Sequence, residues 1–332
     1  DQSIIGWARH IMGGYSTSGA AVTSKVESVT VIPNSTGTAD EVYIVVRRWI
    51  NGASVRYVEF LVPYWSQDTD QEDAFYVDSG LSLDNPLVVT AATRANPCVV
   101  TATSHGFSNG DDIRITNTKG MIEINKTVFR IFNKSTNAFS LCSATRRSTV
   151  ITAATAANPV VITSTGHGLA NGDKIGIFDV VGMTELNGLG FTVAGVSANT
   201  FQLSGINGSS YTSYTSGGVI HNTIDSTAYT TYVADGEARK RVSSISGLNH
   251  LEGETVSILA EGAAHADKVV ASGAITLDRE TSKAHIGLAY ESDFETLRPD
   301  FGAQDGTAQG KLVRMHRVII RFYQSLGGDV GP

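Results

Sequence analysis

Cysteine and charge are both scarce in this chain. Two of its 332 residues are cysteine, 17% are charged, and the formal net charge is −7. Two cysteines cannot form the dense disulfide framework of a small secreted scaffold, so we expect Cys98 and Cys142 to be buried free thiols, with a disulfide between them as the alternative. The negative balance excludes an overall basic field that would attract nucleic acid. Short basic clusters at Arg146-Arg147 and at residues 239–241 fit solvated loops at least as well as phosphate contacts.

Long hydrophobic runs are missing as well, and the longest apolar stretch is far too short to span a membrane. The chain begins Asp1-Gln2-Ser3, without a methionine or a basic and apolar leader, which we interpret as a cut or processed N-terminus. Aromatic residues make up only 8% of the chain, whereas glycine occurs 34 times. That composition is typical of a turn-rich β protein, and the length predicts about two to four domains.

What the sequence does contain is an internal repeat. Residues 89–141 and 151–203 align without a gap at a constant offset of 62 positions. The matched pairs are Asn96/Asn158, Pro97/Pro159, His105/His167, Gly106/Gly168, Asn109/Asn171, Gly110/Gly172, Asp111/Asp173, Ile113/Ile175, Ile115/Ile177, Gly120/Gly182, Met121/Met183, Glu123/Glu185, Asn125/Asn187, Phe129/Phe191, Phe139/Phe201 and Leu141/Leu203. A fixed period of this length indicates a duplicated structural module.

Each copy has the pattern of a short all-β unit. Asn-Gly between two apolar runs predicts a hairpin at Asn109-Gly110 and again at Asn171-Gly172, because both residue types tolerate positive φ. Ile175 and Ile177 alternate, which places them on one face of a strand. The matched positions are therefore mainly turn residues and alternating apolar residues, which a fold needs and a reaction does not.

His105 and His167 are the matched residues that most invite a metal or catalytic interpretation. Neither has a second His or Cys at ligand spacing. We therefore predict a turn or hydrogen-bonding role for both side chains.

The repeat resembles a known module. The pattern N-P-x-V-x-T-x-T-x-H-G-x-x-N-G-D-x-I-x-I, followed by G-M-x-E-x-N and F-x-L, is similar to the small β-barrel half-domain (FCCH) of ubiquitin-activating enzymes, and similar modules recur in bacteriophage tail proteins. That half-domain does not carry the thioester cysteine, and no G-x-G-x-x-G nucleotide motif is present. The resemblance implies a shared module without the enzyme's activity.

The segment before the repeats has the pattern of an antiparallel meander. We expect strands at residues 4–10, 26–32, 41–50 and 53–61, with a hairpin turn at Asn51-Gly52. Four strands joined in series resemble one blade of a β-propeller. One blade cannot close a ring, so its partners are expected beyond Pro332 or on other subunits.

A second resemblance covers this segment and the region after the repeats. The patterns R-x-I-N-G-x-x-x-R-Y-x-E and D-A-F-x-x-D-S-G-L resemble the tail tubular or nozzle proteins of short-tailed bacteriophages. Residues 247–253, with Val256, Ile258 and Gly262, resemble the opening of the platform domain of that family. The matching residues of the first two patterns are Arg48, Ile50, Asn51, Gly52, Arg56, Tyr57, Glu59, Asp73, Ala74, Phe75, Asp78, Ser79, Gly80 and Leu81.

An acidic run precedes the second of these patterns. Asp68, Asp70, Glu72 and Asp73 have the alternating carboxylates that can bind calcium in a loop. The turn glycine and the closing glutamate of an EF-hand are missing, so we favour a solvated acidic loop.

Further strands are expected at residues 255–260, 268–277, 284–290 and 312–324, with a loop at 294–300. The sequence thus predicts a mainly β, multi-domain protein, with a propeller-like meander and a β-barrel-like platform that belong together and two small β-barrel repeats inserted between them. The predicted domains are residues 1–87 for the meander, 88–148 and 149–222 for the repeats, and 223–332 for the platform.

The leading functional hypothesis is a structural virion protein, a subunit of a phage tail tube or nozzle that forms the DNA exit channel. It implies a homo-oligomeric ring that contacts other tail or portal-adaptor proteins and passes DNA without sequence-specific binding. The expected location is the tail of a virion assembled in the bacterial cytoplasm. The repeats would project outwards as fins.

Two other classes were weighed. A receptor- or glycan-binding tail module would use exposed aromatic side chains, for which Tyr211, Tyr214, Tyr229 and Tyr232 are candidates. An enzyme would need a positioned set of catalytic groups, and the G-x-S-x-G match at residues 106–110 lacks its serine in the second copy, where Ala170 stands. We predict no catalytic, cofactor-binding or metal-binding residues.

Overall fold

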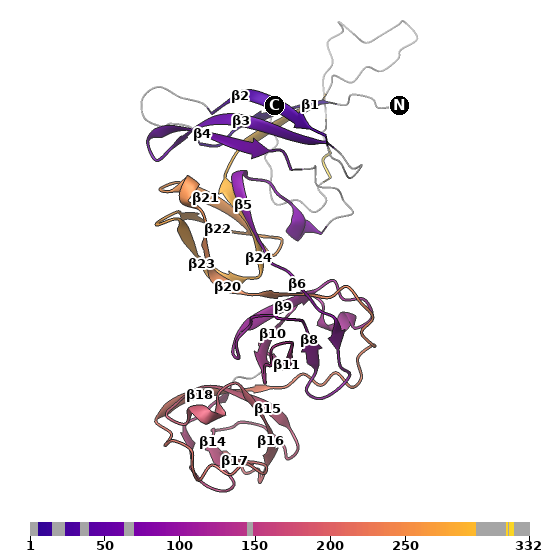
Figure 1. Ribbon diagram of the computed structural model, residues 1–332, viewed down its shortest axis with the longest axis vertical. Coiled ribbons are helices and arrows are strands. Elements are labelled where there is room, and N and C mark those ends of the chain that lie inside the picture. Colours follow the sequence, from indigo (N-terminus) through magenta and orange to yellow (C-terminus); the bar gives the residue numbers. More distant parts are fainter. Residues whose placement is uncertain are drawn as a thin grey trace, which may run out of the picture. The chain divides into compact units, whose positions relative to one another are not determined.

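The computed structural model describes residues 6–14, 24–33, 40–62, 70–144, 149–296, 317 and 319–321. Over these residues the protein is mainly β, with antiparallel sheets, four short 3-10 turns and no α-helix (Figure 1). The predicted fold class is confirmed. None of the described segments forms a helix long and apolar enough to cross a membrane. Residues 1–83 and 243–332 form one compact unit, hereafter unit one, and residues 84–242 form unit two.

Unit one contains a three-stranded sheet of β2 (Lys25–Ile32), β3 (Glu41–Ile50) and β4 (Ala53–Phe60). Asn51 and Gly52 connect β3 to β4 with φ of 47° and 73°, which confirms the predicted hairpin turn. Along β3, every second side chain from Ile44 to Ile50 is buried, as the period of a strand requires.

The predicted first strand exists, but its partner is not the one that a propeller blade requires. Strand β1 (Gly6–Ile11) pairs with β25 (Glu291–Thr296) and forms a separate two-stranded sheet. Four strands in series are therefore wrong for this segment, and residues 294–296 are strand where a loop was predicted. Alternation of apolar and polar residues predicts that a segment forms a strand, but it does not predict which distant strand will pair with it.

The second half of unit one holds a four-stranded sheet in the order β22 (Ala263–Val269), β21 (Thr255–Ala260), β24 (Lys283–Leu288) and β5 (Asp78–Asp84), and a pair of β20 (Val242–Ser246) with β23 (Ala274–Thr281). The predicted strands at 255–260 and 284–290 correspond to β21 and β24. The predicted strand at 268–277 is wrong, because Ser272 and Gly273 adopt positive φ and turn the chain between β22 and β23. Most of the predicted strand at 312–324 lies outside the described residues.

Unit two contains two seven-stranded sheets with the same topology. The first has the order β6 (Leu87–Val88), β19 (Glu237–Lys240), β9 (Asp112–Thr116), β10 (Thr127–Phe132), β11 (Ala138–Ser143), β8 (Val99–Thr101) and β7 (Ala91–Ala92). The second has the order β12 (Thr149–Val150), β18 (Ser216–Asn222), β15 (Lys174–Val181), β16 (Leu189–Ala194), β17 (Thr200–Leu203), β14 (Val161–Thr163) and β13 (Ala153–Ala154).

Each of these sheets curls around its own core. The two edge strands of the first sheet, β6 and β7, are separated by only Val89 and Thr90, whose N–H groups donate to Gly236 and Thr101 on opposite sides. Ile151 and Thr152 do the same in the second repeat. The chain thereby passes directly from one edge of the sheet to the other, which leaves no long open edge. The two cores consist of equivalent residues, with Met121, Phe129 and Phe139 in the first and their counterparts 62 positions later in the second.

The Asn-Gly turns are not hairpins, which corrects the sequence analysis. Strands β8 and β9, on either side of Asn109-Gly110, are separated in the sheet by β10 and β11, and the second repeat has the same order. The side chains instead hold the loop, since Asn109 Oδ1 accepts a hydrogen bond from the Lys134 N–H and Asp111 Oδ2 accepts one from the Ser108 N–H. Polar turn residues that bond to the backbone explain why the pattern is repeated.

The second repeat is inserted within the first. Strand β19 completes the sheet of the first repeat by pairing with β6 and β9, although the sequence analysis assigned residues 223–242 to the platform. Residues 224–240 also correspond to residues 206–222, 18 positions earlier, which close the second repeat through β18. The first repeat is thus interrupted between Ser143 and Ile224, and the second occupies the interruption.

Candidate functional site

A buried ionic cluster joins the residues that carry the nozzle resemblance. The side chain of Arg48, on β3, is fully buried and donates two hydrogen bonds of 2.7 Å to the carboxylate of Glu59 on β4. Its Nη1 also donates to the carbonyl of Gly13 at 2.6 Å and lies 3.5 Å from Asp78 Oδ2 on β5. Asp78 in turn accepts from the Gly13 N–H and contacts His10 Nε2 at 2.9 Å.

Electrostatics keep Arg48 charged. Burial acts to lower the pKa of Arg48, but the hydrogen bonds and negative charges of Glu59 and Asp78 outweigh it and hold the pKa above its ordinary value. All three guanidinium nitrogens donate to carboxylate or carbonyl oxygens of the protein, and the side chain is fully buried. The arrangement ties β3, β4 and β5 together, which is a structural role.

The hairpin tip of the same motif contacts the segment that follows the repeats. The Asn51 N–H donates to Glu254 Oε1 at 2.7 Å, and the Tyr57 hydroxyl donates to the carbonyl of His250 at 2.5 Å. His250 Nε2 lies 2.9 Å from the carbonyl of Ser79. The three patterns that resemble the nozzle family, which are far apart in the sequence, therefore meet in unit one.

The acidic run is engaged by basic side chains where the structure describes it. Asp73 forms an ion pair with Lys283, and His285 Nε2 lies 3.1 Å from the carbonyl of Glu72. Asp68 lies outside the described residues, as do Arg146 and Arg147 of the basic cluster. Within the described ranges, no group of three or more His, Cys, Asp or Glu side chains is arranged to hold a metal ion.

The two repeat histidines have the hydrogen-bonding role that the sequence predicted. His105 Nε2 lies 2.9 Å from the carbonyl of Ser135, and its Nδ1 accepts the N–H of Phe107 at 3.0 Å. His167 makes the equivalent contacts with Ser197 and Leu169. Both rings are buried, so His105 ties its glycine loop to the loop between β10 and β11, and His167 ties its own to the loop between β16 and β17.

The four candidate tyrosines pack into the repeats. Tyr229 and Tyr232 lie against the first core, and Tyr211 and Tyr214 lie against the second. The hydroxyl of Tyr232 donates to the carbonyl of Val89, and that of Tyr214 donates to the carbonyl of Ile151. These side chains therefore hold the closing strand in place and do not form an exposed aromatic cluster.

Two further candidates are explained by the fold. Ser108 of the G-x-S-x-G match lies in the loop between β8 and β9, where no helix follows, so the strand-to-helix turn of a nucleophile elbow is not formed. Cys98 and Cys142 are free, buried thiols, as predicted. Burial raises the pKa of both and makes them weak nucleophiles.

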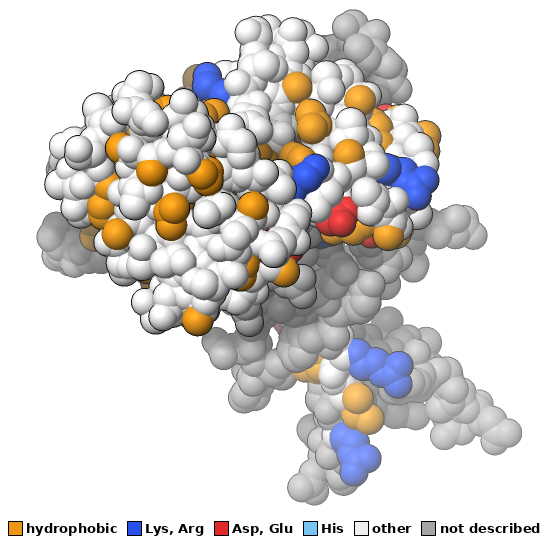
Figure 2. All heavy atoms as spheres, turned by 90° about the horizontal axis from the view of Figure 1, so that it is seen from below, with side chains coloured by type: hydrophobic (Ala, Val, Ile, Leu, Met, Phe, Trp, Pro, Cys, Tyr) orange, Lys and Arg blue, Asp and Glu red, His pale blue; other side chains and the backbone are white. Residues whose placement is uncertain are grey.

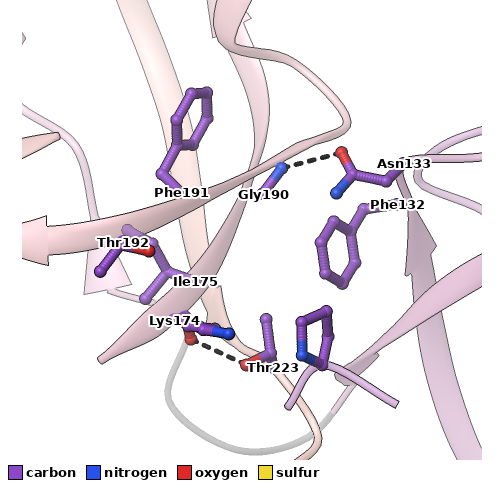
Figure 3. A pocket seen from close by; sticks show the side chains of 9 residues that line it. Phe132, Asn133, Lys174, Ile175, Gly190, Phe191, Thr192 and Thr223 are labelled. Atoms are coloured by element: carbon purple, nitrogen blue, oxygen red, sulfur yellow. Dashed lines mark hydrogen bonds between the residues drawn. The ribbon is translucent and has the colours of Figure 1, made fainter. Parts of the chain in front are cut away.

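A hollow of about 200 Å³ lies where the two repeats meet (Figure 3). The ring of Phe132 and the amide of Asn133 belong to the first repeat, and Lys174, Ile175 and Gly190 belong to the second. Asn133 Oδ1 accepts the N–H of Gly190, and the Lys174 ammonium donates to the carbonyl of Asn96 in the first repeat. Polar groups at its rim therefore connect the two repeats, and we call this boundary between them the seam. The matched positions of the repeat do not indicate this hollow, because Phe132, Asn133, Lys174 and Gly190 differ from their counterparts in the other copy.

His221 lies beside this seam. Its Nδ1 is 2.9 Å from the carbonyl of Ser143, and its Nε2 is 3.4 Å from Arg130 Nη1. Burial lowers the pKa of His221; the Ser143 carbonyl opposes that shift, and the charge of Arg130 adds to it, with Asp112 and Asp179 on the opposing side. The ring is therefore neutral in the folded protein over a wider pH range than in the unfolded chain.

The depressed pKa predicts a loss of stability in mild acid. As the pH falls below about 6.5, the unfolded chain takes up a proton at His221 before the folded protein does, so the free energy of unfolding decreases until the folded pKa is passed. Thermal unfolding by far-UV circular dichroism at about pH 7.5 and 5.5 measures this loss. We expect a smaller loss in His221→Gln, and an equal loss in both proteins would contradict the assignment.

On the face shown in Figure 2, charged side chains are sparse, and apolar side chains are scattered, singly or in small groups, among uncharged ones. That face offers neither a continuous apolar patch nor a basic stripe for nucleic acid.

Part of the chain matches a known domain family. Residues 158–224 match the family described as the ubiquitin-activating enzyme E1 FCCH domain. The match covers β14 to β18 of the second repeat, so the chain contains an FCCH-like domain within a mainly β protein. No curated protein matches the sequence.

Proposed function

We propose that this chain is a structural subunit of the tail tube or nozzle of a short-tailed bacteriophage, and that it acts without catalysis. The observation that carries the proposal is the meeting of three family-like patterns in unit one. They are separated by up to some 200 residues, yet Arg48, Glu59 and Asp78 share one buried cluster, and the Tyr57 hydroxyl donates to the carbonyl of His250. Contacts of this kind are expected if the patterns belong to one ancestral domain that received the repeats as an insertion.

The edges of the three-stranded sheet support the oligomeric part of the proposal. Among the described residues, β2 and β4 each pair only with β3, and both carry exposed apolar side chains. Val29 and Val31 are 63% and 54% exposed, and Val58 and Phe60 are 73% and 56% exposed. An apolar edge strand invites pairing with another chain, and in a ring of identical subunits the neighbouring copy would cover it.

The remaining parts of the proposal follow from charge and position. A net charge of −7 suits a channel wall that DNA passes without the counterion-releasing contacts of a basic surface. The inserted repeats would form the fins of the ring, and the ring would contact other tail or portal-adaptor proteins in the virion, after assembly in the bacterial cytoplasm. The four tyrosines of the glycan-binding alternative are half-buried against the repeat cores, so no observation favours that alternative over the structural role.

Light scattering of the purified chain tests the proposal and the role of β2 together. We expect a ring-sized particle for the parent protein and a smaller mass for the double variant Val29→Lys, Val31→Lys, because two charges would be buried at the subunit contact. Val181→Lys is the matched control, since Val181 is 53% exposed on the second repeat. A parent protein that remains a monomer at all concentrations would overturn the proposal.

A further inference from the structure

We propose that the two repeats form one rigid arm, locked by side chains of the first repeat that fit into spaces left by glycines of the second. The proposal concerns unit two alone and holds whatever the chain's role is. It rests on the packing at the seam, on the hydrogen bonds across it, and on a comparison of equivalent positions in the two repeats.

The seam has its own small apolar core. Phe132 and Cys142 of the first repeat are fully buried, and they pack with Phe178 and Val219 of the second. Arg130 of the first repeat lies over the ring of Phe178, with its guanidinium carbon 5.6 Å from the ring centre. Two modules joined only by a flexible linker would leave these side chains in water, so their burial shows that the modules pack against each other.

Glycine makes this close approach possible. A Cβ on Gly190 would lie 2.4 Å from the ring of Phe132, and a Cβ on Gly176 would lie 2.7 Å from the sulfur of Cys142. Neither glycine has a positive φ, so the backbone conformation does not require them. Both positions are therefore explained by the space that the first repeat occupies.

Hydrogen bonds fix the orientation of the two modules. The Asn133 N–H donates to the carbonyl of Gly188 at 2.9 Å, and Asn133 Oδ1 accepts the N–H of Gly190 at 3.0 Å. The Thr223 hydroxyl can donate to Asn96 Oδ1 at 2.7 Å, on the other side of the hollow. Directional bonds on both sides of an apolar contact oppose rotation of one module against the other.

The repeats differ from each other at the positions that build the seam. Phe132 and Cys142 correspond to Ala194 and Ser204 in the second repeat, whereas Gly176 and Gly190 correspond to Arg114 and Val128 in the first. At the seam, the protruding side chains Phe132 and Cys142 come from the first repeat only, and the glycines that face them come from the second repeat only. Such complementary divergence is expected for one specific, asymmetric contact.

Distance measurements between spin labels test the rigidity in the full chain. Cysteines introduced at Thr136 and Ala198, which are exposed and equivalent in the two repeats, carry the labels, and the native thiols are buried. We expect one narrow distance distribution in the parent protein. Gly190→Leu should broaden or shift it, because the side chain would collide with Phe132. Adding Phe132→Ala to this variant should narrow the distance distribution again, because it removes the ring that the introduced leucine would hit. Alanine is the residue at the equivalent position 194 of the second repeat.

Each outcome decides the question. A broad distribution in the parent would overturn the rigid arm, and an unchanged distribution in Gly190→Leu would overturn the steric lock. If Gly190→Leu does not fold, Phe132→Ala alone must broaden the distribution, since it empties the apolar core of the seam while keeping a side chain that the second repeat tolerates.

Discussion

Replacing Arg48 by methionine is expected to cost unit one about 3–5 kcal/mol of its free energy of unfolding, because it leaves two buried carboxylates without their cation. Arg48 is fully buried, and Glu59 and Asp78 are largely so. All three tryptophans of the chain, Trp7, Trp49 and Trp65, belong to unit one, so intrinsic fluorescence during urea unfolding reports this unit alone. The midpoint should fall while the unfolding of unit two remains unchanged.

Arg56→Met is the matched control for this experiment. Arg56 lies on the neighbouring strand β4 and forms an ion pair with Glu27, but its side chain is exposed to solvent. Exposed ion pairs contribute little because water and salt screen them. If the two methionine variants lost the same stability, the cluster around Arg48 would not be the tie between β3, β4 and β5 described above.

Removing the whole second repeat is expected to leave the first repeat folded. Excision of residues 144–223 joins Ser143 to Ile224, whose N–H already donates to the carbonyl of Leu141 at 2.9 Å. The second repeat makes the same connection without an interruption, from Leu203 through Ser204 and Gly205 to Ile206. The excised chain would therefore regain the uninterrupted sequence of a single module.

The second repeat also supplies the side chains for this design. Gly205 has a φ of 72°, so Ser143→Gly gives the new turn the backbone freedom that its counterpart uses. Phe132→Ala and Cys142→Ser replace the apolar residues that the excision would expose. We expect hydrogen-exchange protection of β9, β10 and β19 to persist. Loss of that protection would show that the first repeat needs the second in order to fold.

A displaced excision provides the control. Removing residues 134–213 deletes the same length but takes away β11, which lies between β8 and β10 in the first sheet. That chain should lose the cooperative unfolding of unit two, because neither core can close. If only the excision of residues 144–223 leaves a folded repeat, the position of the cut matters and not merely the length of the deletion.

The elements that could be predicted from sequence are those specified by neighbouring residues. Asn51-Gly52 predicted its hairpin because both residues adopt positive φ there, and the repeat predicted two equivalent cores because Phe129 and Phe191 occupy the same place in each. The pairing of β1 with β25 could not be predicted from the local sequence, since it joins segments some 280 residues apart. The same limit explains why the contact of Asp78 with Arg48 was not foreseen.

The seam between the repeats was missed for a different reason. Alignment of the two copies draws attention to positions that match, and those positions build the core of each module. Phe132, Gly176 and Gly190 are positions at which the copies differ, and they build the contact between modules. The departures from the repeat, and not its matches, carried the information about how the two copies are joined.

Each repeat begins and ends on neighbouring strands, since Leu87 pairs with Ala238 in the first and Val150 pairs with Val219 in the second. A protein can therefore accept the module as an insertion in a single surface turn, because the two ends of the module are close together. Its own strand pairings are kept after the insertion. Such a module can be transferred between unrelated genes as a finished part. A genome can gain, duplicate or lose such a module while the strands of the protein that carries it stay unchanged.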